Sequence, residues 1–225
     1  MRNLNLSSDN KDSRLRPLVF RVIACTWRTS SSKLPQSIAP FVQHLIIDGY
    51  YVKGILSSCP NIINLTIHGY YTDLNLQEMT HLTRLGVDSS YIQPHNELPI
   101  QPYFNLTHLN VHGANPDSSW REWEFLAHLP KLTHINTDEA IQNHISKVLR
   151  LCPLLKILVV EFFKSHRSLH YLHACYQVDD NRLVLTVWKS YSGHIRDWER
   201  GAHGLVDLWI ISERIVFARS SECSC

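Results

Sequence analysis

The chain has 225 residues, of which 44% are hydrophobic and 19% charged, and its formal net charge is +2. This composition is typical of a globular domain with a sizeable core, and it excludes wholesale disorder and collagen-like or low-complexity chains. The small net charge also argues against a nucleic-acid partner, because such proteins present a basic face over the folded domain.

The sequence shows neither a membrane segment nor a secretion signal. Its apolar runs fall short of the roughly 20 residues that a spanning helix needs, so we expect no membrane partner. Residues 1–11 are polar, and the six cysteines form no C-x-x-C pair. We therefore expect an intracellular protein, cytoplasmic or nuclear, with reduced thiols.

The N-terminal segment is strongly basic. Residues 1–33 contain seven Lys or Arg and only two Asp, so the rest of the chain is mildly acidic. A short cluster of this kind is more typical of a solvated arm than of a phosphate-binding surface. We therefore assign residues 1–37 to a basic N-terminal arm and leading segment.

An apolar skeleton repeats from residue 42 onward. It consists of an apolar residue, two others, a second apolar residue, one other and a third apolar residue. Six copies begin at Val42, Ile62, Leu82, Leu106, Leu132 and Leu155, at spacings of 20, 20, 24, 26 and 23 residues. This is the L-x-x-L-x-L core of a leucine-rich repeat, whose strands bury their leucine faces by stacking in parallel. Residues 183–187 predict a seventh, degenerate strand.

Helical patterns lie between the predicted strands. Residues 52–56, 120–126 and 138–151 each precede a Cys-Pro or Leu-Pro pair, where a helix cannot continue. An ordinary doubly wound sheet would not repeat this unit at nearly constant spacing. The predicted fold class is therefore α/β: a leucine-rich-repeat-like solenoid over residues 38–188, with short parallel strands on the concave face and helices on the convex face. Residues 89–102 contain three prolines and predict an irregular loop.

Residues 189–225 predict a helical C-terminal cap followed by a disordered tail. Terminal solenoid repeats need a covering element with a polar outer face. Apolar residues recur here at roughly helical spacing: Leu205, Leu208, Trp209, Ile211 (or Ile210), Ile215 and Val216. The alternative interpretation is a helix that binds a partner.

The polar positions of the predicted strands fall together on the concave face. Five of the 14 histidines lie there, and adjacent strands are about 4.8 Å apart, so these side chains form one patch. The candidate binding residues are His44, Asp48, Asn64, His68, Arg84, Asp88, His108, Asn110, His112, His134, Asn136, Asp138 and Glu161. We expect this face to bind a protein or peptide, with solvated outward positions as the alternative. Because an unperturbed histidine has a pKa near 6.5, the face is expected to gain positive charge just below neutral pH.

Metal and catalytic motifs are incomplete. His166, His170 and His173 would share one helix face near Cys175, but the C-x₂₋₄-C half of a zinc site and the glutamate of H-E-x-x-H are missing. The chain lacks the glycine-rich phosphate and dinucleotide motifs and the G-x-S-x-G motif. Cys59 and Cys152 precede prolines at turns and are expected to be buried and unreactive. We therefore expect no metal, no cofactor and no enzymatic activity.

Two segments resemble the "L-x-x-C-P-x-L-x-x-L-x-L" unit of F-box/leucine-rich-repeat proteins: LSSCPNIINLTI at 56–67 and LRLCPLL at 149–155. The chain is most similar to the fungal set with short, degenerate repeats. Residues 13–21, 38–45, 197–202 and 207–209 resemble the segment after the F-box, the start of the repeats and the C-terminal portion. The resemblance implies the substrate-recognition part of a cullin-type ubiquitin ligase receptor.

The chain departs from that family in two ways. We see no F-box, so contact with a cullin ligase adaptor is expected only if an F-box exists upstream. The asparagine that should follow each strand is also replaced, for example by Tyr50 and Tyr70, so the usual ladder of buried asparagines cannot form. A general interaction scaffold, or a truncated paralogue without a ubiquitin role, is the alternative.

Overall fold

The computed structural model describes residues 18–24, 36–49, 53–69, 76, 79–89, 105–113, 119–162, 177–187 and 190–222. Its centre is a parallel sheet of eight strands whose spatial order is their order in the chain. The strands are β1 (Leu18–Ala24), β2 (Val42–Gly49), β3 (Asn64–His68), β4 (Arg84–Asp88), β5 (His108–His112), β6 (His134–Asp138), β7 (Ile157–Phe162) and β8 (Leu183–Val187). The chain is therefore of the α/β class, as predicted.

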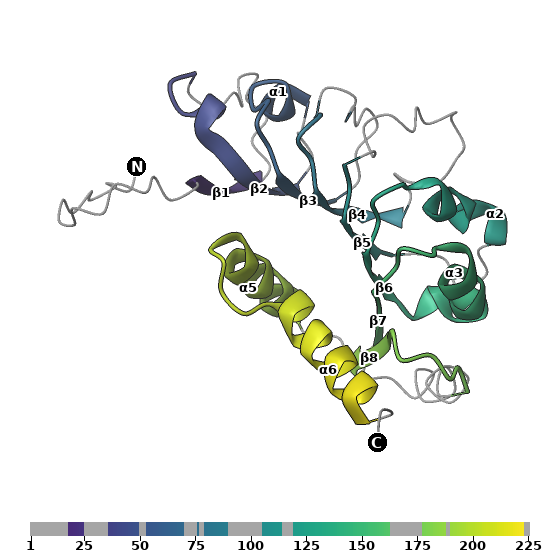
Figure 1. Cartoon of the computed structure of the whole chain (residues 1–225). Helices are drawn as coiled ribbons and strands as arrows, with labels where there is room; N and C mark the ends of the chain where they lie inside the picture. Colours follow the sequence, from purple (N-terminus) through teal and green to yellow (C-terminus); the bar gives the residue numbers. More distant parts are fainter. Residues whose placement is uncertain are drawn as a thin grey trace.

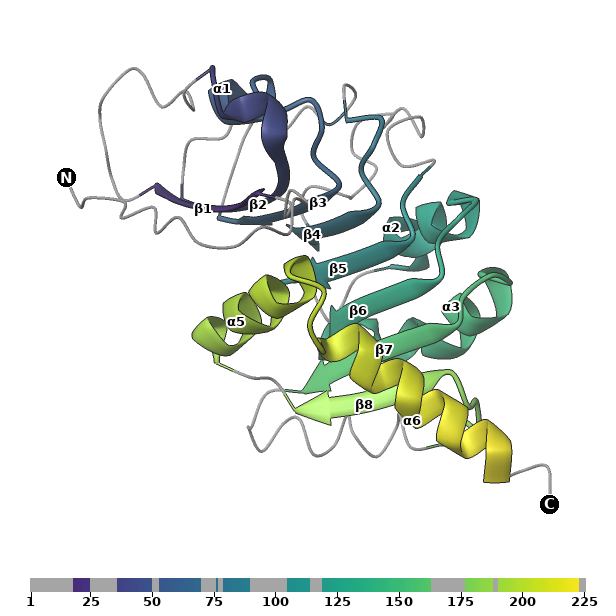
Figure 2. The same ribbon diagram turned by 60° about the vertical axis from the view of Figure 1, so that its left-hand side comes forward.

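Helices lie on both faces of the sheet (Figures 1 and 2). On one face lie α1 (Lys53–Leu56), α2 (Trp120–Trp123), α3 (Ile145–Leu151) and the 3-10 segments η4 (Glu124–His128) and η5 (Glu139–His144), while η1 (Ala39–Phe41) precedes β2. On the other face lie α5 (Tyr191–Ala202) and α6 (Leu208–Glu222), on the inner side of the bend of the sheet in Figure 1. None of the described helices has the length and hydropathy required to cross a bilayer.

The predicted elements from residue 42 onward match the structure closely. Each copy of the apolar skeleton contains a strand, and the degenerate copy at 183–187 is β8. The helical segments end before their Cys-Pro or Leu-Pro pairs, although part of each of the two longer ones is 3-10 rather than α-helical. Strand β1 was not predicted, and it lies inside the segment assigned to the basic arm. Most of the proline-containing loop at 89–102 lies outside the described residues.

The core lies between the sheet and α1–α3. The leucine positions of the skeleton point into it, and residues such as Leu45, Leu65 and Leu109 are fully buried. Burying one such side chain contributes about 1.5–3 kcal/mol. Cys59 and Cys152 are buried at the turns before their prolines, as predicted, and removal from water raises the pKa of each thiol to about 11.

A ladder of threonines joins successive repeats at the amino ends of the strands. The hydroxyl oxygen of Thr133 lies 3.1 Å from the carbonyl oxygen of Thr107, that of Thr107 lies 3.1 Å from the carbonyl oxygen of Thr83, and the hydroxyl of Thr83 donates to the carbonyl of Ile63 over 3.3 Å. Backbone amides of the same residues bond to the same carbonyls. These bonds tie each repeat to the preceding one.

Candidate protein-binding face

The register of the sheet places the predicted polar residues in rows across the strands. The first row runs His44, Asn64, Arg84, His108 and His134, and it ends at Ile157. A second row runs Ile46, Thr66, Gly86, Asn110, Asn136, Val159 and Val184. Both rows follow from parallel pairing in which each skeleton aligns with its neighbour.

The third row of polar residues consists of three separate pairs rather than one continuous series. Asp48 lies opposite His68, Asp88 opposite His112, and Asp138 opposite Glu161. All 13 candidate residues therefore occupy the strand positions from which we predicted a shared patch. Whether they bind a protein stays a prediction, and the side chain of Asp48 lies outside the described part.

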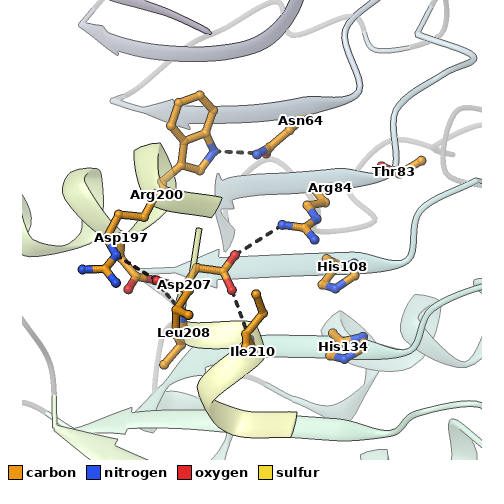
Figure 3. A network of polar contacts seen from close by, with 12 residues as sticks. Asn64, Thr83, Arg84, His108, His134, Asp197, Arg200, Asp207, Leu208 and Ile210 are labelled. Atoms are coloured by element: carbon orange, nitrogen blue, oxygen red, sulfur yellow. Dashed lines mark hydrogen bonds and ion pairs between the residues drawn. The ribbon is translucent and has the colours of Figure 1, made fainter. Parts of the chain in front are cut away.

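This polar face is largely covered, because α5 and α6 lie across it (Figure 2). The indole Nε1 of Trp198 on α5 donates to Oδ1 of Asn64 over 3.0 Å. Arg84 Nη1 lies 3.3 Å from Oδ2 of Asp207, directly before α6 (Figure 3). Asn64 and Asp207 are buried as a result. The predicted cap is helical, but it contacts the middle of the strand face as well as the last strands.

The turn between the two helices presents Asp207 to Arg84. Asp207 Oδ1 accepts from the amide of Ile210 at 3.0 Å, which caps the start of α6. Asp197 Oδ2 accepts from the amide of Leu208 at 2.9 Å, so α5 holds the first residue of α6. Gly201 is required by close approach, because a Cβ there would collide with the carboxylate of Asp207.

Two stacked histidines meet α6 in the centre of the face. The rings of His108 and His134 are parallel with centroids 4.2 Å apart, and the Trp209 ring stands edge-on to them at 5.1 and 5.7 Å. His134 Nε2 also lies 3.2 Å from Oε1 of Glu213, one turn further along α6. The face and the helix therefore meet through an aromatic cluster with an acidic group at one side.

The hydrogen bonds around His134 indicate its tautomer. Its Nδ1 lies 2.8 Å from the hydroxyl of Thr133, and its Nε2 faces the Glu213 carboxylate, which only accepts. A neutral His134 therefore carries its proton on Nε2 and accepts at Nδ1 from Thr133. That hydroxyl then cannot also donate to Thr107, so the tautomer and the threonine ladder compete for one proton.

A second group of histidines lies deeper in the third row. The His112 ring lies 5.7 Å from that of His68 and 5.8 Å from that of His194 on α5. His194 Nε2 in turn lies 3.3 Å from Oε2 of Glu161, and these side chains are only 11% and 1% exposed. Helix α5 thus contributes an imidazole to the polar face.

Burial under the helices changes the acid–base behaviour of the face. Removal from water, assisted by positively charged or titratable neighbours, lowers the pKa of His108 to about 2 and that of His112 to about 3. Burial also lowers the pKa of His134, although Glu213 opposes the shift, and that of His44. The expectation that the face gains charge just below neutral pH is therefore wrong for the folded chain, because the C-terminal helices exclude water from the imidazoles.

A polar cavity of about 60 Å³ remains between the sheet and the two helices. Asn136 lies in its lining and is fully buried, yet neither its amide nitrogen nor its amide oxygen has a hydrogen-bond partner in the described part of the chain. Oδ1 of Asn110 is also buried without a hydrogen-bond partner among the described residues. The volume suits a few water molecules and is less than half of the ~150 Å³ that accommodates benzene in an engineered cavity.

The last strands hold α6 by apolar contacts instead. Ile157, Val159, Val184 and Leu208 form a second buried cluster, against which the partly buried Trp209, Ile215 and Val216 pack. Arg219 Nη1 also donates to the carbonyl of Leu183 over 2.6 Å. Leu205, which was expected to pack, is instead exposed because α6 begins only at Leu208, and of the alternatives Ile210 and Ile211 it is Ile210 that is partly buried.

Sequence reasoning missed the residues that the helices bring to the site. These are Trp198, His194, Asp207, Trp209 and Glu213. The available signal was charge complementarity: a segment with carboxylates at 207 and 213 follows a strand face that contains Arg84 and five histidines.

Comparisons with known proteins find no counterpart: no family model, no curated protein and no solved structure matches the chain. Within the described residues, no group of three or more His, Cys, Asp or Glu side chains is arranged to hold a metal ion. The histidines at 166–173 and Cys175 lie outside the described residues.

Proposed function

We propose that the chain is a non-enzymatic protein-recognition module built as a leucine-rich-repeat solenoid, with the strand face of β2–β6 as its recognition surface. The solenoid interpretation is supported by strands that pair in chain order and by buried skeletons at spacings of 20 to 26 residues. Stacked repeats of this kind generate extended binding surfaces.

One observation carries the proposal: the strand face engages a helical segment through specific side-chain contacts. Asn64, Arg84 and His134 come from three different strands, and each has a polar partner on α5, on α6 or in the turn between them. The face therefore has the spacing and chemistry to recognise a helix.

Within this class, we propose a ubiquitin-ligase receptor that presents substrates on this face. The support is the resemblance of the two Cys-Pro units and of residues 207–209 to F-box/leucine-rich-repeat proteins. The alternative is an interaction scaffold unconnected with ubiquitin, which the same geometry serves equally well.

Affinity purification of the tagged full chain from fungal cells tests the proposal. A ligase role predicts that a cullin and its adaptor are recovered, whereas a scaffold predicts other partners in their absence. Replacing His108, His112 and His134 together by Ala should abolish recovery of the face-bound partner.

A matched control is available because His81 and His128 are exposed and lie outside the strands that carry that triad. Their double Ala variant should recover partners like the unmodified chain. Circular dichroism establishes that each variant is folded, and Arg84→Met provides a single-site test if the buried triple variant unfolds. Unchanged recovery by folded face variants would contradict the proposal.

A further inference from the structure

Helix α6 is held by two different kinds of interface. Toward β7 and β8 it packs on Ile157, Val159 and Val184, as a permanent core element does. Toward β4–β6 it makes polar contacts beside a cavity with unsatisfied amides. Polar interfaces of this kind resemble those between separable partners more than those within a core.

The spacing of the polar contacts matches the geometry of a helix lying across parallel strands. Asp207 pairs with Arg84 on β4, and Glu213 pairs with His134 on β6. From the cap residue Asp207 to Glu213 the six-residue rise is ~9 Å at helical spacing, while two strand spacings span ~9.6 Å. Trp209 lies between the two carboxylates and covers the histidine of the intervening strand, His108. Three consecutive strands thus contact a pattern in the helical segment: an acidic residue, an aromatic residue two positions later, and a second acidic residue six positions after the first.

We propose that the face of β4–β6 recognises a helix of a partner protein that carries this acid–aromatic–acid pattern, and that residues 207–213 occupy the face as an internal ligand until the partner replaces them. The inference rests on the proposed recognition function and names the class of partner.

The solvent exposure of the polar pairs and the firm attachment of the far end of α6 both allow a partner helix to replace residues 207–213. The side chain of Glu213 is 55% exposed and that of Arg84 is 35% exposed, so solvent already reaches both polar pairs. The far end of α6 stays attached through the apolar cluster and the bond from Arg219 to Leu183. A tethered internal ligand competes at an effective concentration in the millimolar range, so the free face is exposed only to partners that bind tightly.

A labelled peptide of residues 205–219, titrated against the full chain by fluorescence anisotropy, tests the inference. Asp207→Asn removes the charge that pairs with Arg84 but keeps an efficient helix cap. We expect this variant to bind the peptide about tenfold more tightly than the unmodified chain, because its internal ligand is weakened.

Two controls separate recognition from general loosening. Glu199→Gln removes a carboxylate from α5 that has no described hydrogen bond or ion pair to the sheet, and it should bind like the unmodified chain. A peptide with Asp207→Asn and Glu213→Gln should bind the Asp207→Asn chain about tenfold more weakly than the natural peptide. Circular dichroism and size-exclusion chromatography verify that every chain is folded and monomeric before titration.

Equal binding of the natural and altered peptides would overturn the inference, as would failure of a folded Asp207→Asn chain to bind either. If purification still depends on the face histidines in that case, the recognition function stands and only the internal-ligand inference fails. If the peptide binds as expected but no partner is recovered from cells, the recognition function fails instead.

Discussion

Acidification should destabilise this protein well above the pH at which carboxylates protonate, because it folds with neutral imidazoles under α5 and α6. His108 and His112 have pKa values of about 2 and about 3 in the folded chain, against an ordinary histidine pKa of 6.5. A group whose folded pKa is depressed in this way binds its proton preferentially when the chain unfolds. Each such histidine therefore leaves stability intact above pH 6.5 and lowers it progressively below that value.

The size of the effect follows from the same values. At pH 5, which is 1.5 units below the pKa of 6.5, a histidine in the unfolded chain is protonated, while the same histidine in the folded chain stays neutral. Each of the two histidines therefore lowers the free energy of unfolding by about 2 kcal/mol. The two together amount to about 4 kcal/mol, a large part of the 5–15 kcal/mol that typically stabilises a domain. His44 and His134 change in the same direction.

Groups around the two histidines define what is titrated. His108 faces His134, Arg84 and Trp209, and His112 faces His68 and His194 and lies opposite Asp88 in the register. Glu213 reaches His134, and Glu161 reaches His194, so those two imidazoles have a nearby carboxylate. Protonation of His108 and His112 therefore adds positive charge where positive or titratable groups already lie. This added charge favours separation of the helices from the sheet.

Urea unfolding followed by tryptophan fluorescence at pH 7.5, 6.5, 5.5 and 5.0 measures the effect. Trp198 and Trp209 lie at the interface and report its opening. We expect the free energy of unfolding to fall by about 4 kcal/mol between pH 7.5 and 5.0. Replacing both histidines by Gln should flatten the dependence, whereas His128→Gln, at an exposed position, should retain it. A stability that stays constant from pH 7.5 to 5.0 would refute the reasoning.

Three further outcomes follow from the packing. Arg182→Met should lower the free energy of unfolding by about 2–3 kcal/mol, because the Arg182 guanidinium donates hydrogen bonds to the carbonyl of Leu149 and to a neighbouring carboxylate. Thermal denaturation of the variant measures this loss, and Arg182→Lys should restore only part of it. Cys59 and Cys152, both buried with a raised pKa, should resist iodoacetamide at pH 8 and react only in denaturant, as peptide mass spectrometry will show. A high-resolution crystal structure should place ordered water within hydrogen-bonding distance of the Asn136 amide, and a dry cavity would contradict our account of this site.

The strands and their register were predictable because the signal is local and repeated. Each copy of the skeleton fixes which residues point to the core, and the near-constant spacing aligns neighbouring copies. Pairing of Leu65 with Leu85 and of Leu109 with Ile135 follows directly. Strand β1 escaped prediction because it lies in a basic segment, although its Phe20 and Val22 align in register with the skeleton residues Leu45 and Ile47.

The position of the C-terminal helices was not predictable from periodicity. Helix α6 has apolar residues around its whole circumference: Leu208 is buried, while Ile211 and Phe217 are 41% and 75% exposed. No single stripe therefore indicates which side faces the sheet. The pKa values of the histidines depend on that same long-range packing, so the sequence could place the imidazoles in one patch but not indicate that water is excluded from them.

The contrast between the two ends of the strand face bears on why its polar residues lie under a helix. Toward β7 and β8 the rows end in Ile157, Val159 and Val184, which hold α6 without any buried polar group among them. Continuing such residues across the face would hold the helix more firmly, since buried charge pairs contribute less than apolar packing of similar volume. The chain instead places Arg84 and His134 there and lowers its own stability in acid. A face used only to hold α6 gains nothing from that chemistry, whereas a face that must also recognise a second, acidic helix requires it.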